Sequence, residues 1–143
     1  MLMVINPAPP RVGTVRVLRT ARPRRTVERV LAVIPATQWL DRAVFWLMYD
    51  TQLRVLPLCR LTVADVDLAS PLPVVRCGER WRLLTEAPTV TALTAYLPLR
   101  SASSDFLLTH AERPLDFAYL DQRWRMYCQR AGVTCTLREL RGG

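Results

Sequence analysis

The chain of 143 residues has the length of one ordinary domain, with room for a single hydrophobic core. Hydrophobic residues make up 50% of the sequence and charged residues 22%, which argues against a mostly disordered chain. All 20 basic residues are arginines, and against 12 acidic residues they give a net charge of +8, which favours a polyanionic partner. A GC-rich coding sequence would also enrich arginine over lysine. Without lysine and with His110 as the one histidine, the chain excludes chemistry that needs a lysine acid, a Schiff base or a histidine pair.

The four cysteines indicate buried, reduced thiols rather than a metal site. They are Cys59, Cys77, Cys128 and Cys135. Their spacing contains no C-x-x-C pair, so we predict neither a metal site nor a cofactor. No apolar run approaches the length of a membrane span, and the first residues lack the charged region of a secretion signal. A cytoplasmic protein without membrane association is therefore expected.

Residues 1–25 differ in composition from the rest of the chain. They hold six arginines and four prolines and contain no acidic residue. This composition predicts an extended basic arm or linker, and both a solvated tail and a nucleic-acid-binding arm fit it. Residues 26–143 are expected to form the folded domain.

Three helices are predicted after the arm. Thr26 is placed to cap the first, whose apolar residues follow the 3.6-residue period until Pro35 ends it. The second, over residues 38–49, is apolar on nearly all sides, which predicts a place at the centre of the core. Pro57 suits the first turn of a short third helix that ends near Leu61.

The middle of the chain predicts short strands. Residues 65–67 are expected to form a turn. The β-like runs 74–76 and 81–84 flank residues 77–79 and predict a hairpin, and residues 106–108 are a candidate third strand.

Further helices are predicted between and after these strands. One starts after Pro88. Its inward residues are Val90, Leu93, Tyr96 and Leu97. A longer one ends at Gly132, a natural C-cap, and has one apolar stripe. That stripe consists of Phe117, Leu120, Trp124, Tyr127, Cys128 and Ala131. A last helix begins around Thr136. The fold class predicted is α+β, mainly helical, with a small antiparallel β-sheet.

Residues 49–68 resemble the first arginine box of the tyrosine recombinases, the phage integrase family, which usually reads Y-x-T-G-L-R-x-S-E-L-x-x-L-x-W-x-D-V-D. The match holds at Tyr49, Thr51, Leu53, Arg54, Leu58, Leu61, Asp65, Val66 and Asp67. Gln52 replaces the glycine of the box, and Leu56 and Pro57 replace its serine and glutamate.

Later segments follow in the order found in that family. Glu79 and Arg80 lie where its K-x-R-x-V-P-L segment would be, and residues 105–108 resemble its "LF" strand. The match continues with the turn at 113–115 and the helix ending at Gly132. It ends at residues 136–141, which resemble the T-P-H-x-L-R box. The resemblance covers residues 26–143 and implies a partial tyrosine-recombinase catalytic domain.

The resemblance also implies roles for individual arginines. In the family a tyrosine attacks a DNA phosphodiester, and two arginines clamp the non-bridging oxygens. By position Arg54 and Arg141 resemble these two, and Arg138 stands in place of a histidine. Arg54 could instead be a surface arginine or the ion-pair partner of Asp50.

Other parts of the family's active site have no counterpart here. Arg76 and Arg80 lie near the position of the lysine that protonates the leaving oxygen; they can bind phosphate, but a guanidinium keeps its proton. Phosphate contacts are also expected from the arm, at Arg22, Arg24 and Arg25. The sequence ends two residues after Arg141, before the family's nucleophile would occur. Tyr49, Tyr96, Tyr119 and Tyr127 all occupy helical positions, so none is expected to replace it.

Two functions remain open at this point. The first is a DNA-binding remnant of a site-specific tyrosine recombinase, catalytically inactive alone, that holds double-stranded DNA by its phosphates. A homologous recombinase would be a further partner. The second is a non-enzymatic module for protein interaction or self-association, because half a domain exposes apolar surface. In a variant of the second, a separately encoded fragment supplies the tyrosine.

Overall fold

The computed structural model describes residues 24–142. Its helices are α2 (Arg24–Val33), α3 (Trp39–Thr51), α4 (Val55–Cys59), α5 (Ala87–Tyr96), α6 (Phe117–Ala131) and α7 (Leu137–Leu140). Its strands are β1 (Val66–Asp67), β2 (Val74–Cys77), β3 (Arg80–Leu83), β4 (Thr109–His110) and β5 (Arg113–Pro114). This arrangement confirms the predicted α+β, mainly helical class with a small antiparallel sheet.

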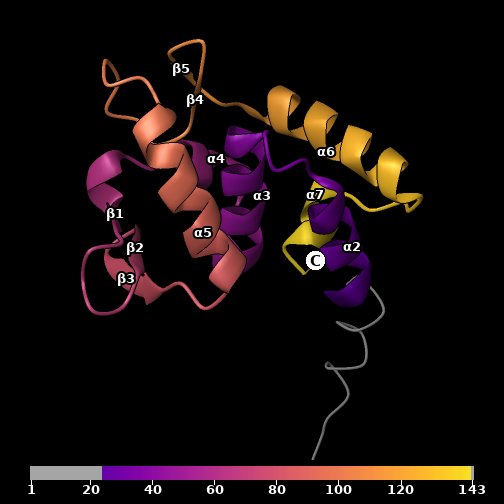
Figure 1. The fold of residues 1–143 in the computed structure, drawn as a ribbon, viewed down its shortest axis with the longest axis horizontal. Helices are drawn as coiled ribbons and strands as arrows, with labels where there is room; N and C mark the ends of the chain where they lie inside the picture. Colours follow the sequence, from indigo (N-terminus) through magenta and orange to yellow (C-terminus); the bar gives the residue numbers. More distant parts are fainter. Residues whose placement is uncertain (1–23, 143) are drawn as a thin grey trace, which may run out of the picture.

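Helix α3 is the centre of the core, as its nearly uniform apolar surface predicts. Residues 43–48 are all buried. Figure 1 shows α5 on one side of α3. Helices α2, α6 and α7 lie on another side, and the small sheet lies at the far end from α6. The ring of Phe45 lies 5.1 Å from Trp124 and 6.2 Å from Tyr127, measured between centroids, so aromatic contacts join α3 to α6.

Helix α2 begins earlier than expected. The helix includes Arg24 and Arg25, so Thr26 lies inside it, and the prediction that Thr26 is the N-cap is wrong. The apolar period itself is confirmed, because Val27, Val30 and Leu31 are buried on the side that packs against α6. The helix ends before Pro35, as predicted.

The sheet contains the predicted hairpin but a different third strand. In the described part of the chain, β1, β2 and β3 pair in that order, all antiparallel, with Val66 opposite Val75 and Val75 opposite Arg82. Residues 66–67, expected as part of a turn, therefore form a strand after a short 3₁₀ turn at Val63–Asp65.

Residues 106–108 are not a strand, contrary to expectation. Phe106 makes only an isolated bridge to Thr62. Leu107 and Leu108 both point into the core, and the carbonyl of Leu107 accepts a hydrogen bond from the Tyr96 hydroxyl at 2.8 Å. The same hydroxyl accepts from the N–H of Thr109 at 3.2 Å, so a side chain rather than a neighbouring strand satisfies this backbone.

Helix α6 matches its prediction at the end but not at the start. Gly132 terminates it in the left-handed conformation, with φ of +71°, and Asp116 caps its first turn by accepting from the N–H of Tyr119. Phe117, expected on the inner stripe, is 57% exposed. As the first helical residue it lies before the turn of α6 that packs on α3.

A buried carboxylate links α3 to α6. Asp41 is 1% exposed and accepts hydrogen bonds from Arg123 at 2.6 and 2.9 Å and from the hydroxyls of Tyr119 and Tyr127. The apolar sequence around Asp41 gave no sign of this network. A buried charge is tolerated only when it is paired and hydrogen-bonded, so the network fixes how α6 sits on α3.

No helix among residues 24–142 combines the length and apolarity required to cross a bilayer.

Candidate nucleic-acid interface

Arg54 is presented at the junction between α3 and α4. Thr51 closes α3, with its hydroxyl donating to the Leu47 carbonyl at 2.8 Å, and Gln52 reverses the chain in the left-handed conformation. Arg54 then becomes the N-cap residue of α4, with an extended backbone and an exposed side chain. Its guanidinium makes no hydrogen bond or ion pair with any residue between 24 and 142.

Arg54 and Asp50 do not form the ion pair considered as an alternative. The Asp50 carboxylate instead accepts hydrogen bonds from the backbone N–H groups of Thr85 and Glu86 at 3.1 and 2.9 Å, and from the Thr85 hydroxyl. Asp50 therefore holds the start of α5 against α3. The charge of Arg54 is left available for an external anion.

The hairpin is tethered beside Arg54. Arg82, on β3, donates to the carbonyl of Thr51 at 2.6 Å, which fixes the hairpin to the last turn of α3. The turn between β2 and β3 uses Gly78 at a φ of +69°. It leads into Arg80, the first residue of β3, which is exposed and has no partner within the described residues. Sequence reasoning did not identify this role of Arg82.

Arg76 is held more tightly than Arg80. Its Nε donates to Asp65 at 3.1 Å, and its guanidinium lies over the ring of Trp81 at 6.0 Å from the centroid. The Asp65 carboxyl is also bound by Thr62; burial opposes its ionisation, but these hydrogen bonds outweigh burial and lower its pKa. Arg76 still contributes to the positive potential of this surface, but its ion pair with Asp65 reduces that contribution.

Arg141 follows the short helix α7. Thr136 and Glu139 form a reciprocal capping box that starts this helix, and Arg141 stands at its C-terminal end, half-buried and without a side-chain partner in the described chain. The next residue, Gly142, lies so close to α3 that an added Cβ would be 3.2 Å from Oε1 of Gln52. The segments that carry Arg54 and Arg141 therefore meet, although they are far apart in sequence.

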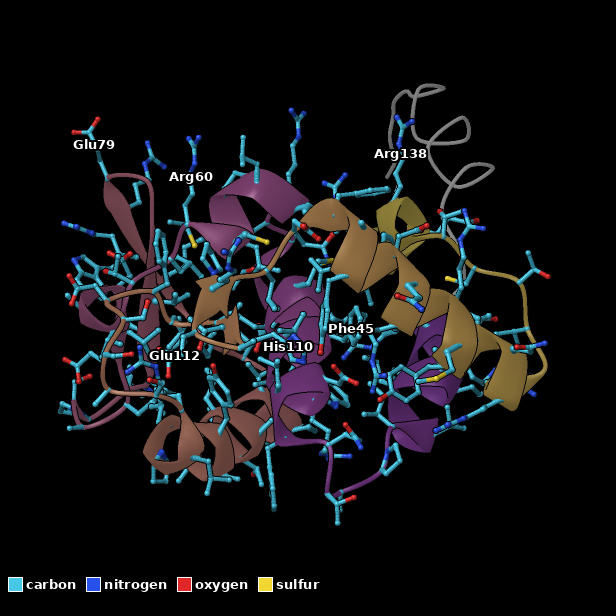
Figure 2. All side chains as sticks on the ribbon, turned by 90° about the horizontal axis from the view of Figure 1, so that it is seen from above. Phe45, Arg60, Glu79, His110, Glu112 and Arg138 are labelled. Atoms are coloured by element: carbon cyan, nitrogen blue, oxygen red, sulfur yellow. The ribbon has the colours of Figure 1, made fainter. Side chains whose placement is uncertain are left out.

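Figure 2 shows Arg60, Glu79 and Arg138 projecting from one edge of the molecule. They come from the end of α4, the hairpin turn and α7. Arg60, which sequence reasoning missed, lines with Arg76 a shallow cavity of about 350 Å³ between α4 and the hairpin. Its position in the helix that follows Arg54 was the available signal.

The arginines of the N-terminal segment differ in whether an acidic residue pairs with them. Arg22 lies outside the described residues. Arg24 donates to Glu86 at 2.7 Å and to Glu28 at 3.0 Å and lies over the ring of Tyr49, and the hydrogen bond to Glu86 is the main reason that its pKa is raised. Arg25 is exposed and has no partner within residues 24–142. Arg24 is therefore less available to a ligand than Arg25.

The guanidiniums left without an acidic partner define the candidate interface. Within the described residues those on the α4, hairpin and α7 side are Arg54, Arg60, Arg80 and Arg141. We call this set the phosphate face. Arg138 lies on the same edge and has an interaction within the protein. No group of three His, Cys, Asp or Glu side chains in residues 24–142 is arranged to hold a metal ion.

The four tyrosines of the sequence all use their hydroxyls inside the protein. Tyr49 donates to Glu28 at 3.1 Å, Tyr96 to the Leu107 carbonyl, and Tyr119 and Tyr127 to Asp41. Burial is the largest cause that raises the pKa values of Tyr49, Tyr119 and Tyr127 to about 12. None of the four hydroxyls is therefore left without a hydrogen-bond partner. His110 stacks on Tyr119, with 5.0 Å between ring centroids.

Gln52 allows a test of this junction. A non-glycine residue in the left-handed conformation is strained, and Gln52, with φ of +62°, occupies the position of the box's glycine. Gln52→Gly is expected to raise the free energy of unfolding by up to about 1 kcal/mol, because relief of this strain exceeds the loss of the exposed hydrogen bond to Tyr49. Urea unfolding measures the change. Gln52→Ala is the control and should give no gain; a loss of stability in the glycine variant would contradict the expectation.

Comparisons with known proteins lead to relatives of one kind. No protein-family model matches the chain. The sequence is 39% identical over 140 residues to tyrosine recombinase XerA of Thermococcus kodakarensis, covering 93% of this chain and 49% of that relative. It is 34% identical over 128 residues to XerA of Thermococcus onnurineus, covering 82% of this chain and 44% of that one. The chain thus spans about half the length of the curated relatives it matches.

Solved structures agree in fold. A crystal structure of XerA recombinase superposes with a TM-score of 0.70 at 24% identity, covering 85% of this chain and 46% of that one. A XerH site-specific recombinase, crystallised with its difH substrate before cleavage, gives 0.69 at 18% identity, covering 87% and 41%. The sequence similarity to the XerA recombinases identifies the chain as part of a tyrosine recombinase catalytic domain. The superpositions confirm its α+β fold.

Proposed function

We propose that this domain binds double-stranded DNA through the phosphate face, as the DNA-holding part of a site-specific tyrosine recombinase. The observation that carries this proposal is that arginines without an acidic partner among residues 24–142 lie on neighbouring segments of a chain with net charge +8. Gly142, next to Arg141, meets Gln52, and Arg60 lines one cavity with Gly78 of the hairpin turn. Arginines that have no acidic partner within the described residues can pair with an external anion.

The chemistry of the phosphate face suits a DNA backbone. A guanidinium presents a planar fork of N–H donors that pairs with two phosphate oxygens. Arg54 and Arg141 are carried by segments that meet at Gln52 and Gly142, so both can approach the same part of a duplex. Contacts of this kind hold and orient DNA but do not read its sequence.

The related structures support DNA as the partner. The XerH recombinase whose fold this chain shares was crystallised with its difH substrate both before and after cleavage. This chain aligns with less than half of that protein, so DNA binding here is inferred from the combination of fold and unpaired arginines.

We further propose that this polypeptide does not cleave DNA alone. Every tyrosine hydroxyl is engaged within the fold. The raised pKa values of Tyr49, Tyr119 and Tyr127 also make their phenolates less accessible at neutral pH. No lysine exists to protonate a leaving oxygen, and arginine keeps its proton. Phosphate binding is therefore retained while proton donation is not.

The binding proposal is tested by titrating a fluorescent duplex with the protein at several salt concentrations. Four phosphate contacts predict a slope of roughly −3 to −4 for the logarithm of the association constant against the logarithm of salt concentration. An affinity that stays constant between low and moderate salt would overturn the proposal.

The absence of cleavage is tested separately with a nicked suicide substrate. Such a substrate traps any covalent phosphotyrosyl adduct, which denaturing electrophoresis detects as a band of higher mass. We expect no adduct at a protein concentration that saturates binding. A stable adduct would contradict the proposed inactivity without affecting the binding proposal.

A second candidate function is self-association through the outer face of the hairpin. Trp81 and Leu83 are 51% and 48% exposed on one face of β3, and Leu72 nearby is 60% exposed. Exposed apolar side chains in one area favour a protein contact. Light scattering over a range of concentrations tests this. Oligomers that form while duplex affinity is absent would favour this second function over the first.

A further inference from the structure

The turn between α6 and α7 folds the chain back on the end of α6. The N–H of Gly132 donates to the Gln129 carbonyl and that of Val133 to the Cys128 carbonyl, both at 3.1 Å. This pair of bonds is a Schellman motif, which reverses the chain after a helix. The residues that follow therefore return to the last turn of α6.

The reversal brings Cys135 against Cys128. The Cys135 carbonyl accepts hydrogen bonds from the Trp124 indole at 3.0 Å and from the Cys128 thiol at 3.2 Å. The Cys135 thiol donates to the Thr136 carbonyl at 3.7 Å. Both residues are buried and reduced. The Cys128 sulfur is thus held against the backbone of Cys135, so the chain brings the two cysteines together, as a disulfide requires.

A cavity gives small molecules a route to this pair. Its volume is about 390 Å³, and both cysteines line it together with Trp124, Asp121 and Arg125. Neither Cys59 nor Cys77 lines it.

The remaining cysteines are less reactive by their surroundings. Burial raises the pKa of the Cys59 thiol to about 11 and also raises the pKa of Cys77. At Cys128 the hydrogen bond from the Cys135 thiol outweighs burial and lowers the pKa. The thiolate is the nucleophile in disulfide exchange, so Cys128 is favoured as the attacking group.

We propose that Cys128 and Cys135 are a dithiol site that forms an intramolecular disulfide with a low-molecular-weight disulfide as oxidant. The Cys128 thiolate attacks one sulfur of the oxidant, forms a mixed disulfide and releases one small thiol. Cys135, deprotonated, then attacks the Cys128 sulfur and releases the second. The protein loses two hydrogen atoms, and one small disulfide is reduced to two thiols.

The test treats the reduced 143-residue protein with oxidised glutathione. We expect the intact mass to fall by two hydrogen atoms, two of the four thiols to become unreactive toward maleimide, and peptide mapping to find Cys128 joined to Cys135. Cys128→Ser and Cys135→Ser should each abolish the cross-link. Cys59→Ser is the matched control and should retain it.

Several results would overturn the dithiol site. They are a glutathione adduct on Cys128 that persists without a cross-link, a disulfide that includes Cys59 or Cys77, or retention of all four reactive thiols. Because peptide mapping of the unmutated protein gives the answer directly, a serine variant that fails to fold does not affect the decision.

Discussion

Replacing Arg54 and Arg141 together by alanine is expected to weaken duplex DNA binding by roughly 100-fold at low salt. Each guanidinium is expected to make a charged hydrogen bond to phosphate, worth about 1.5 kcal/mol, or about tenfold in affinity. Each single variant should therefore bind about tenfold more weakly than the wild type. Fluorescence anisotropy with a labelled duplex measures all three constants under the same conditions.

Matched variants separate this effect from a simple loss of charge. Arg125→Ala removes the same charge from α6, where Arg125 is 78% exposed and paired with Asp121, so its effect on affinity should be small. Arg54→Lys keeps the charge but not the planar fork and should fall between the wild type and Arg54→Ala. An Arg54/Arg141 double variant that binds as well as Arg125→Ala would rule out the phosphate face.

Replacing Asp41 by alanine is expected to be the most destabilising single substitution among those considered. It removes the acceptor shared by Arg123, Tyr119 and Tyr127 and leaves their donors in a buried site. Breaking a buried ion pair costs about 3–5 kcal/mol, and the lower end applies because the Arg123 side chain is 29% exposed. Urea unfolding followed by tryptophan fluorescence measures the change in the free energy of unfolding.

Two controls accompany the Asp41 variant. Asp121→Ala breaks an exposed ion pair on the same helix as Arg123 and should change stability by no more than about 0.5 kcal/mol. Tyr119→Phe removes one donor and should cost about 1 kcal/mol. If Asp41→Ala unfolds at the same urea concentration as Asp121→Ala, the network does not fix α6 on α3.

Helices with a strong apolar period or a uniformly apolar surface could be predicted from the sequence, because both patterns are local. The central position of α3 and the end of α6 at Gly132 are examples. The features that could not be predicted depend on hydrogen-bond partners from other parts of the sequence. The carbonyl of Leu107 is taken by Tyr96, and the partners of Asp41 lie 78 or more residues away. Neither relationship leaves a periodic signal.

The candidate site shows the same division. The motif made Arg54 and Arg141 candidates, since it preserves residue types and spacing, and their role stays a prediction. It could not show which arginines are neutralised, because one of the two acids that pair with Arg24 is Glu86, 62 residues away. It also missed Arg60, whose availability depends on how α4 packs beside the hairpin.

The salt dependence of DNA binding by the wild type and the Arg54/Arg141 double variant is the most direct test of the phosphate face. Removing one arginine that binds a phosphate should reduce the magnitude of the slope of log affinity against log salt by about 1, so the double variant should have a slope smaller by about 2. Arg125→Ala should keep the wild-type slope. Equal slopes for the wild type and the double variant would show that these two arginines do not hold the DNA backbone.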